Sequence, residues 1–339
     1  TCAGENANFL DTDFSEAGAK IVYSAKDVYQ ADFVIKVEPP TLDELQLMKG
    51  RQVLISALQL TTKKKEYIKL LVSKKIPSLA YEFIQDDEGS MPIIRSMSEI
   101  AGNTAILIAS EYLSNVNNGK GLMLGGIAGV SPSEVVVIGA GTVGEFATRS
   151  AMGLGASVKI FDNSLSKLRR IQNDLHTRVY TSIIQPKILR KALQRADVVI
   201  GALRSVDGKR SPCVVSEEMV MNMKEGSVII DICIDQGGCI ETSELTNHAK
   251  PTFVKHGVIH YCVPNIASRV SRTASFSLSN LLTPILLRMG DNGGFENLLK
   301  QDKGLRNGVY VCHGKVANRT VGEWFSMPYQ EVELIFASL

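Results

Sequence analysis

Short apolar runs alternate with amphipathic stretches along most of this chain. In the first third, apolar runs of strand length occupy residues 31–36, 52–58 and 78–83. A helical pattern fills 63–74, and apolar side chains recur at helical spacing through 96–113. The first third is therefore predicted to be α/β, followed by one long amphipathic helix.

The alternation continues to about residue 263 and then changes. Further strands are predicted at 134–138, 157–162, 178–183, 197–203, 227–234 and 257–263. Helices are expected between the earlier strands, whereas the connection after Asp235 looks irregular, and 273–289 reads as a long apolar helix. This order predicts a doubly wound, mostly parallel sheet with helices on both faces. A chain of 339 residues exceeds one ordinary core, so we expect two domains.

A glycine-rich turn follows the strand predicted at 134–138, in the sequence EVVVIGAGTVG. Gly139 allows a tight turn, Gly141 lets the backbone approach a pyrophosphate, and Gly144 lets the next helix pack on the sheet. Thr142 and Val143 lie in the same turn, where free N–H groups of a helix start attract phosphate. The pattern predicts a nicotinamide dinucleotide site; the alternative is a similar sheet that binds no nucleotide.

Asp162 follows Gly144 by 18 residues, at the end of the next predicted strand. A carboxylate at that place accepts hydrogen bonds from the ribose hydroxyls of NAD. It would repel a 2′-phosphate, and the next residues, Asn163 and Ser164, offer no cation. NAD is therefore predicted rather than NADP.

Overall charge and cysteine usage narrow the range of partners. The chain has 37 basic and 35 acidic residues, so nothing favours nucleic acid or a membrane surface. Its six cysteines form no CxxC pair and no zinc-type spacing with histidine, so no metal is expected. With no signal segment and no apolar run long enough to span a bilayer, we expect a cytoplasmic protein.

Four segments carry a resemblance to a known family. They are PIIRSMSEIAG at 92–102, GLMLGGIAGV at 121–130, MKEGSVIIDICIDQGG at 223–238 and HGVIHYCVPNIASRVSRT at 256–273. With the glycine-rich turn, they resemble alanine dehydrogenase and the related soluble subunit of proton-translocating transhydrogenase. The IDQGG stretch and the PNIASRVSRT run are more similar to alanine dehydrogenase.

The resemblance implies a fold and an activity. The expected fold is a Rossmann domain, 93–271, inserted into a second α/β domain that binds substrate and consists of 1–92 and 272–339. The implied reaction is the reversible oxidative deamination of L-alanine to pyruvate and ammonia, with NAD as hydride acceptor. Its partners would be an amino acid or 2-oxo acid and further copies of the chain, because family members are commonly homohexamers.

Further cofactor residues follow from the resemblance alone. Ser98 matches a serine on the phosphate or nicotinamide side, and Lys167 a basic residue on the adenosine side. The segments expected around the cofactor are Ala202 and Leu203, then Ile232, Ile234 and Asp235, then Val263, Asn265 and Ile266. For the apolar members, simple core packing is the alternative.

Asp235 is also singled out by its own position. It follows a buried strand, beside Gln236-Gly237-Gly238, at the carboxyl edge where α/β sheets bind ligands. There its carboxylate could orient ammonia, an imine or a water next to the nicotinamide. The alternative is an aspartate that only caps a turn.

The substrate-binding positions depart from the family pattern. Glu38 stands where the family motif KVKEP has its substrate-binding lysine, and Lys36 replaces that lysine only if the alignment shifts. Gln59 stands where the family has a catalytic histidine, and an amide cannot transfer a proton near neutral pH. The arginine that the family contributes from a leading segment has no counterpart, because the sequence starts after that point.

Three functions therefore stay open on the sequence. One is an alanine dehydrogenase or a variant acting on another amino or imino acid, for which Asp235, Gln59 and Lys36 are the candidate catalytic residues. Glu38 would suit a cationic amine better than a bare carboxylate. The second is a protein that binds NAD(H) without turnover, and the third is a hydride-transfer subunit of transhydrogenase type.

Overall fold

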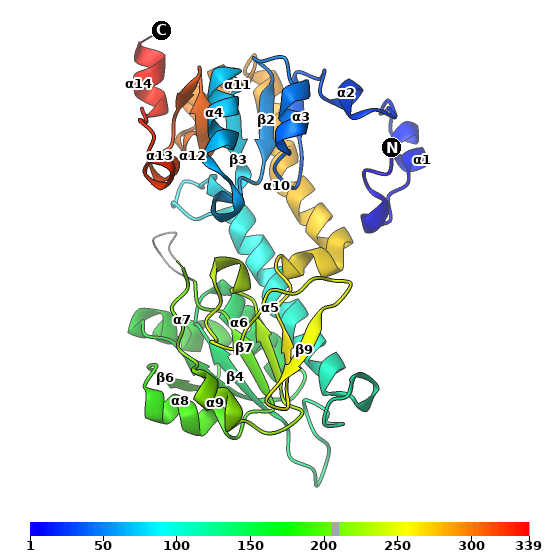
Figure 1. Ribbon diagram of the computed structural model, residues 1–339, viewed down its shortest axis with the longest axis vertical. Coiled ribbons are helices and arrows are strands. Elements are labelled where there is room, and N and C mark those ends of the chain that lie inside the picture. The colour runs from blue at the N-terminus through cyan, green and yellow to red at the C-terminus, as the bar shows by residue number, and fades with distance from the viewer. Residues whose placement is uncertain (205–209, 339) are drawn as a thin grey trace. The chain divides into compact units, whose positions relative to one another are not determined.

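The computed structural model describes residues 1–204 and 210–338 and divides the chain into two compact units (Figure 1). Unit 1 is Thr1–Ser96 with Ser275–Leu339, and unit 2 is Met97–Ala274. The chain passes from one unit to the other within α5 (Pro92–Leu113) and again within α10 (Ser271–Asp291). The sequence placed these passages at 92/93 and 271/272.

Unit 2 contains a seven-stranded sheet in the order β6-β5-β4-β7-β8-β10-β9. Neighbouring strands from β6 to β10 are parallel, which confirms the doubly wound prediction. The strands are β4 (Glu134–Ile138), β5 (Ser157–Phe161), β6 (Tyr180–Ser182), β7 (Val198–Gly201), β8 (Val228–Asp231), β9 (Thr252–Lys255) and β10 (Val258–Tyr261).

The antiparallel edge strand β9 was not predicted from the sequence. It pairs with β10 through a two-residue turn at His256 and Gly257, both with positive φ. Such turns match the twist of a hairpin. The strand itself is TFVK and only partly buried, so it lacks the strong apolar pattern of the central strands.

Alternate side chains of the central strands enter two separate cores. Val135 and Val137 of β4 pack in one cluster, whereas Val136 and Ile138 pack in the other. Helices therefore cover both faces of the sheet (Figure 1). The remaining helical elements of unit 2 are α6 (Thr142–Gly153), α7 (Leu165–Leu175), α8 (Pro186–Leu193), α9 (Glu217–Met221) and the 3-10 turns η4 (Asn115–Asn117), η5 (Ile234–Gln236) and η6 (Ile266–Val270).

Unit 1 contains a five-stranded mixed sheet in the order β1-β2-β3-β11-β12. Strands β1 to β3 are parallel, whereas β11 runs antiparallel to both β3 and β12. The strands are β1 (Phe33–Ile35), β2 (Val53–Ser56), β3 (Ser78–Ala80), β11 (Val309–Cys312) and β12 (Lys315–Val316). The strand predicted at 78–83 ends early, and Tyr81–Phe83 forms a 3-10 turn instead. The prediction was too long because an apolar run alone does not distinguish a strand from a helical turn.

Helices surround this second sheet. The expected helix at 63–74 is α4 (Lys65–Ser73), and α5 begins earlier than expected, at Pro92, because proline suits a first helical position. The others are α1 (Asp11–Glu16), α2 (Ala25–Val28), α3 (Leu42–Leu47), α11 (Phe295–Gln301), α12 (Lys303–Gly308), α13 (Arg319–Phe325), α14 (Val332–Ala337), η1 (Glu5–Ala7), η2 (Leu60–Thr62) and η3 (Tyr81–Phe83).

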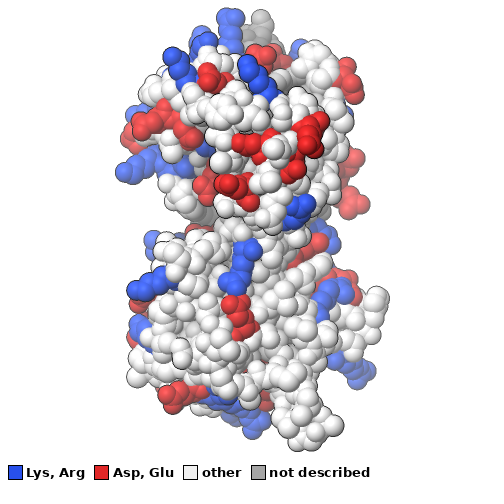
Figure 2. All heavy atoms as spheres, turned by 90° about the vertical axis from the view of Figure 1, so that its right-hand side faces the viewer, with Lys and Arg blue, Asp and Glu red and all other residues white. Residues whose placement is uncertain are grey.

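Surface charge is mixed on the face drawn in Figure 2, where acidic and basic side chains are interspersed. This agrees with the small net charge of +2. Within the described residues, no helix combines the length and the apolar content that a bilayer span needs.

The tight contact at Gly144 predicts a large effect of one methyl group. A Cβ there would lie 1.8 Å from the Gly139 carbonyl oxygen, whereas one at Gly153 of the same helix would meet no heavy atom within 4 Å. We expect Gly144→Ala to lower the free energy of unfolding by at least about 2 kcal/mol. Gly153→Ala should leave it unchanged or raise it by up to about 1 kcal/mol. Urea unfolding measures both, and equal stability of the two variants would contradict the contact.

Candidate functional site

The turn between β4 and α6 has the geometry that dinucleotide-binding turns require. Gly139 has φ +115°, and a Cβ on it would lie 2.4 Å from the Ala202 carbonyl oxygen. Gly144 packs against the Gly139 carbonyl, so the helix starts directly on the strand end. Gly141 is the N-cap of α6 and has open space where a side chain would be. A phosphate can therefore approach the backbone at Gly141.

The N-terminus of α6 is suited to hold an anion. Gly141 has no side chain to cap the helix, and the first N–H that bonds back is that of Glu145, to the Gly141 carbonyl. The N–H groups of Thr142 and Val143 are thus available for a ligand, at the positive end of a 12-residue helix. The residues present fit the pyrophosphate of a dinucleotide.

Asp162 lies beside this turn and is 5% exposed. Its carboxylate accepts hydrogen bonds from the N–H of Ala140 and the N–H of Ser164, each at 2.7 Å. The side chain predicted to bind ribose therefore also holds the glycine-rich turn in place. Each carboxylate oxygen can accept more than one hydrogen bond, so the ribose role stays open.

Arg170 of α7 supports the same turn from the other side and was missed in the sequence. Its guanidinium donates to the Ala140 carbonyl at 3.1 Å and to Glu145 at 2.7 Å. Glu145 is 5% exposed and also binds Arg149 at 3.0 Å. The i, i+4 spacing of Glu145 and Arg149 was visible in the sequence, but the pairing with Arg170 requires α6 and α7 to be neighbours.

Four other predicted cofactor residues lie on elements next to the turn. Gly102 of α5 packs on α6, since a Cβ there would lie 2.5 Å from the Val143 carbonyl oxygen. Ser98 lies one helical turn before Gly102 and so on the same face of α5. Ala202 contacts Gly139, and the Leu203 carbonyl accepts a bond from Ser211. Lys167 lies in the first turn of α7, which Ser164 caps.

The segment after β8 carries the predicted Asp235. It lies in η5 and is exposed, between the partly buried Ile234 and Gln236. Ile232 is also partly buried and pairs by its N–H with the Gly201 carbonyl of β7. Asp235 therefore stands exposed at the carboxyl edge of the sheet, although partial burial of its carboxyl group raises its pKa.

In the third predicted segment, which contains Val263, Asn265 and Ile266, the apolar side chains pack in the core. Val263 and Ile266 are each 3% exposed and belong to the hydrophobic core. Asn265 between them is exposed and has a left-handed backbone, φ 52°. Any contact of Val263 or Ile266 with a ligand would have to use their backbone groups.

The predicted substrate residues lie in unit 1. Lys36 is bound by both carboxylate oxygens of Glu44, at 2.8 and 2.9 Å, so its charge is already paired. Gln59 follows β2 with a left-handed backbone, φ 49°, and its N–H donates to Glu82. A non-glycine residue in this conformation is uncommon and recurs at ligand sites.

Lys63, at the start of the helical pattern predicted for 63–74, was not among the residues predicted for the site. It is partly buried, with its amine 5.3 Å from the centre of the Tyr67 ring. Burial lowers the pKa of Lys63, while the nearby Glu38 carboxylate raises it in part. Glu38 itself is exposed. A cation therefore does lie near Glu38, although not at the position that the family motif suggested.

A cavity of about 480 Å³ lies elsewhere in unit 1, lined among others by Asp86, Arg288, Asp302 and Lys303. None of the residues predicted for the cofactor or the substrate lines it. We assign it no role in the site.

The fold and the glycine-rich turn define a nicotinamide dinucleotide-binding α/β protein of the dehydrogenase class. Comparison with known proteins identifies it further. Residues 1–101 match the alanine dehydrogenase/PNT N-terminal domain, and residues 105–319 match the alanine dehydrogenase/PNT C-terminal domain. The chain belongs to the alanine dehydrogenase/PNT family, so the resemblance seen in the sequence is confirmed.

Comparison with individual proteins supports the same family. The chain is 39% identical to alanine dehydrogenase 2 of Staphylococcus aureus (strain USA300) over 334 residues, 98% of this chain and 89% of the relative. A solved L-alanine dehydrogenase superposes with a TM-score of 0.89 and 36% identity, covering 96% of this chain and 89% of the other. A transhydrogenase from Sinorhizobium meliloti shares the fold, with a TM-score of 0.78 and 24% identity over 93% of this chain and 89% of its own.

Arg170 provides a test of how the turn is held. Arg170→Ala removes a charged hydrogen bond to the Ala140 carbonyl, which is worth about 1.5 kcal/mol, or roughly tenfold in affinity. We expect dinucleotide binding to weaken by that factor, measured by the fluorescence of bound NADH. The adjacent, exposed Arg169→Ala is the matched control and should bind normally. Equal weakening in both variants would show that only general positive charge matters.

Proposed function

We propose that this protein is an NAD-dependent alanine dehydrogenase. It would convert L-alanine, NAD⁺ and water reversibly into pyruvate, ammonium, NADH and a proton. The observation that carries the proposal is the agreement of a full-length family match with a β4–α6 turn open to a pyrophosphate. When bound, the nicotinamide supplies hydride transfer, and the protein supplies binding, orientation and proton handling.

Unit 2 is proposed to be the cofactor domain. The α6 N-terminus would hold the pyrophosphate, and Asp162 the adenosine ribose. The buried carboxylate of Asp162 favours NAD, because a 2′-phosphate beside it would be repelled. Asp235, exposed at the carboxyl edge of the sheet, would orient the ammonia, imine or water.

Unit 1 is proposed to be the substrate domain. Gln59, held in its left-handed conformation, can donate a hydrogen bond to a carbonyl oxygen but cannot move a proton. Lys63 is the better candidate for the substrate carboxylate, because Lys36 is held in an ion pair by Glu44, whereas Lys63 makes no ion pair among the described residues. Its lowered pKa also suits proton exchange better than an ordinary lysine would.

Turnover is the direct test. Purified protein with NADH, ammonium and pyruvate should oxidise NADH, followed by absorbance, and NADPH should be a poorer donor. Reactions without ammonium or without pyruvate are the controls. If no 2-oxo acid in a panel causes oxidation while NADH still binds, the protein is a nucleotide-binding protein without dehydrogenase turnover.

A second candidate function is favoured by Glu38. Its exposed carboxylate is suited to a cationic amine, so the substrate would be a basic amino acid or an imine. Glu38→Lys separates the two candidates. If alanine is the substrate, the new cation should lower KM for alanine, by about tenfold for one added ion pair. If the substrate is cationic, the same change should abolish its binding.

The control for this substitution is Asp27→Lys, which makes the same change of charge on an exposed residue of α2. It should leave both KM values unchanged. Improved alanine turnover in the Glu38→Lys variant would rule out the cationic substrate.

A further inference from the structure

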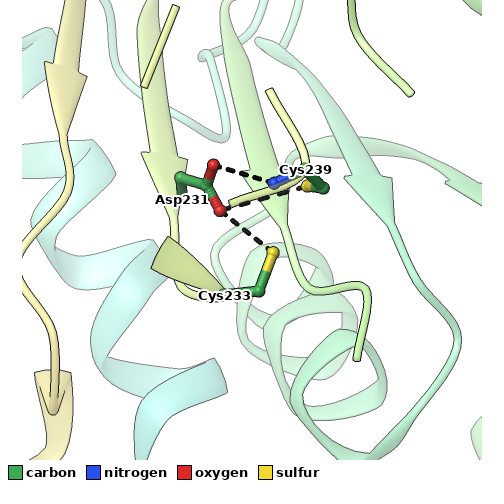
Figure 3. Close-up of side chains that lie close together, drawn as sticks. All are labelled: Asp231, Cys233 and Cys239. Atoms are coloured by element: carbon green, nitrogen blue, oxygen red, sulfur yellow. Dashed lines mark hydrogen bonds between the residues drawn. The ribbon is translucent and has the colours of Figure 1, made fainter. Parts of the chain in front are cut away.

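A cluster of buried polar side chains lies at the end of β8, outside the proposed substrate chemistry. Asp231 ends the strand, and the chain then turns through η5 and returns at Cys239. The Asp231 carboxylate accepts a bond from the Cys233 thiol at 3.0 Å and from the Cys239 N–H at 3.1 Å, while the Cys239 thiol lies 4.0 Å away (Figure 3). The three side chains converge on one point.

Three glycines leave room for this convergence. A Cβ on Gly201 of β7 would lie 2.8 Å from the Cys239 sulfur and 3.0 Å from the carboxylate. A Cβ on Gly238 would lie 2.8 Å from the other carboxylate oxygen. Gly237 and Gly238 both have positive φ, which lets the chain reverse within the few residues between the two cysteines. The backbone is thus built closely around the cluster.

The carboxylate is buried without a compensating cation. Asp231 is 1% exposed, and burial raises its pKa. In the part of the chain that the structure describes, it accepts hydrogen bonds from the Cys233 and Cys239 thiols and the Cys239 N–H, and none from a lysine, arginine or histidine. The buried Ser243 hydroxyl lies close to the carboxylate and offsets part of that pKa shift. Buried carboxylates are normally paired with a cation or coordinate a metal.

We propose that Asp231, Cys233 and Cys239 bind a thiophilic divalent cation, with Zn²⁺ as the natural candidate. Their ligand atoms lie within 4.8 Å of one another, and all three residues are buried. Zinc takes sulfur at about 2.3 Å and carboxylate oxygen at about 2.0–2.2 Å, so small side-chain shifts bring these atoms into a tetrahedral arrangement. The Ser243 hydroxyl or a water completes the four ligands.

Binding exchanges protons for the metal. A hydrogen bond with Cys233, burial and the neighbouring Asp231 keep the pKa of the Cys239 thiol well above its usual value. When Zn²⁺ binds, two Zn–S bonds form and two thiol protons leave to solvent, so no oxidant or reductant is needed. The metal would link Asp231, at the end of β8, to Cys239, which follows the turn that carries Asp235.

The spacing explains why the sequence did not suggest this site. Cys233 and Cys239 are six positions apart and form no CxxC pair, and Asp231 is a ligand from the strand itself. The proposal does not depend on the dehydrogenase assignment, because it concerns metal binding by the resting protein.

Cadmium titration of metal-free protein tests the site. A Cys2→Ser, Cys213→Ser background removes the two exposed thiols, and Cd²⁺ is added while the ultraviolet thiolate-to-cadmium band is followed. We expect one equivalent to bind and Zn²⁺ to displace it. Adding Cys233→Ser or Cys239→Ser should weaken binding at least about tenfold. Cys312→Ser, which removes a buried thiol from unit 1, is the matched control and should bind one equivalent.

Circular dichroism verifies that each variant is folded. Absence of a stoichiometric cadmium band in the folded background protein overturns the proposal, whatever the variants do. Unchanged affinity in folded Cys233→Ser and Cys239→Ser proteins overturns it as well. Because none of these measurements uses dehydrogenase activity, failure of the metal site and failure of the proposed function are separate results.

Discussion

The contact between Gly144 and the Gly139 carbonyl is the constraint on which the cofactor domain depends. It starts α6 directly on the end of β4, so the helix N-terminus points out of the carboxyl edge of the sheet. Any side chain at Gly144 would separate helix and strand. The same turn brings Gly139 against Ala202, the residue after β7, and so joins the ends of the two central strands at the place where strand order reverses.

Charged groups then hold this turn on both sides. The Ala140 N–H is bound by Asp162, and the Ala140 carbonyl by Arg170. Arg170 is fixed by Glu145, a buried carboxylate that also binds Arg149. The backbone of the single residue Ala140 is therefore held by Asp162, just after β5, and by Arg170 of α7, which Glu145 of α6 fixes. This preorganises the backbone that a pyrophosphate would contact.

Unit 1 carries side chains that differ from the family motif at the positions predicted to bind substrate. After the parallel strand β1, Lys36 is paired with Glu44, and Glu38 is exposed. Lys63 lies near Glu38 after the left-handed Gln59, so a lysine is still present at this end of the sheet. Its placement follows from the η2 turn rather than from a motif.

The sequence by itself determined the class of fold, because period-two apolar strands alternating with helices can bury their faces in few other ways. It also identified the glycine-rich turn and Asp162, since their spacing is set by one βαβ unit. Only the tertiary structure decided the antiparallel edge strand β9, the Arg170–Glu145 support and the meeting of Asp231 with two cysteines. Each of these depends on which elements become neighbours. That choice is made by packing and hydrogen bonding across the sheet, which no local pattern in the chain records.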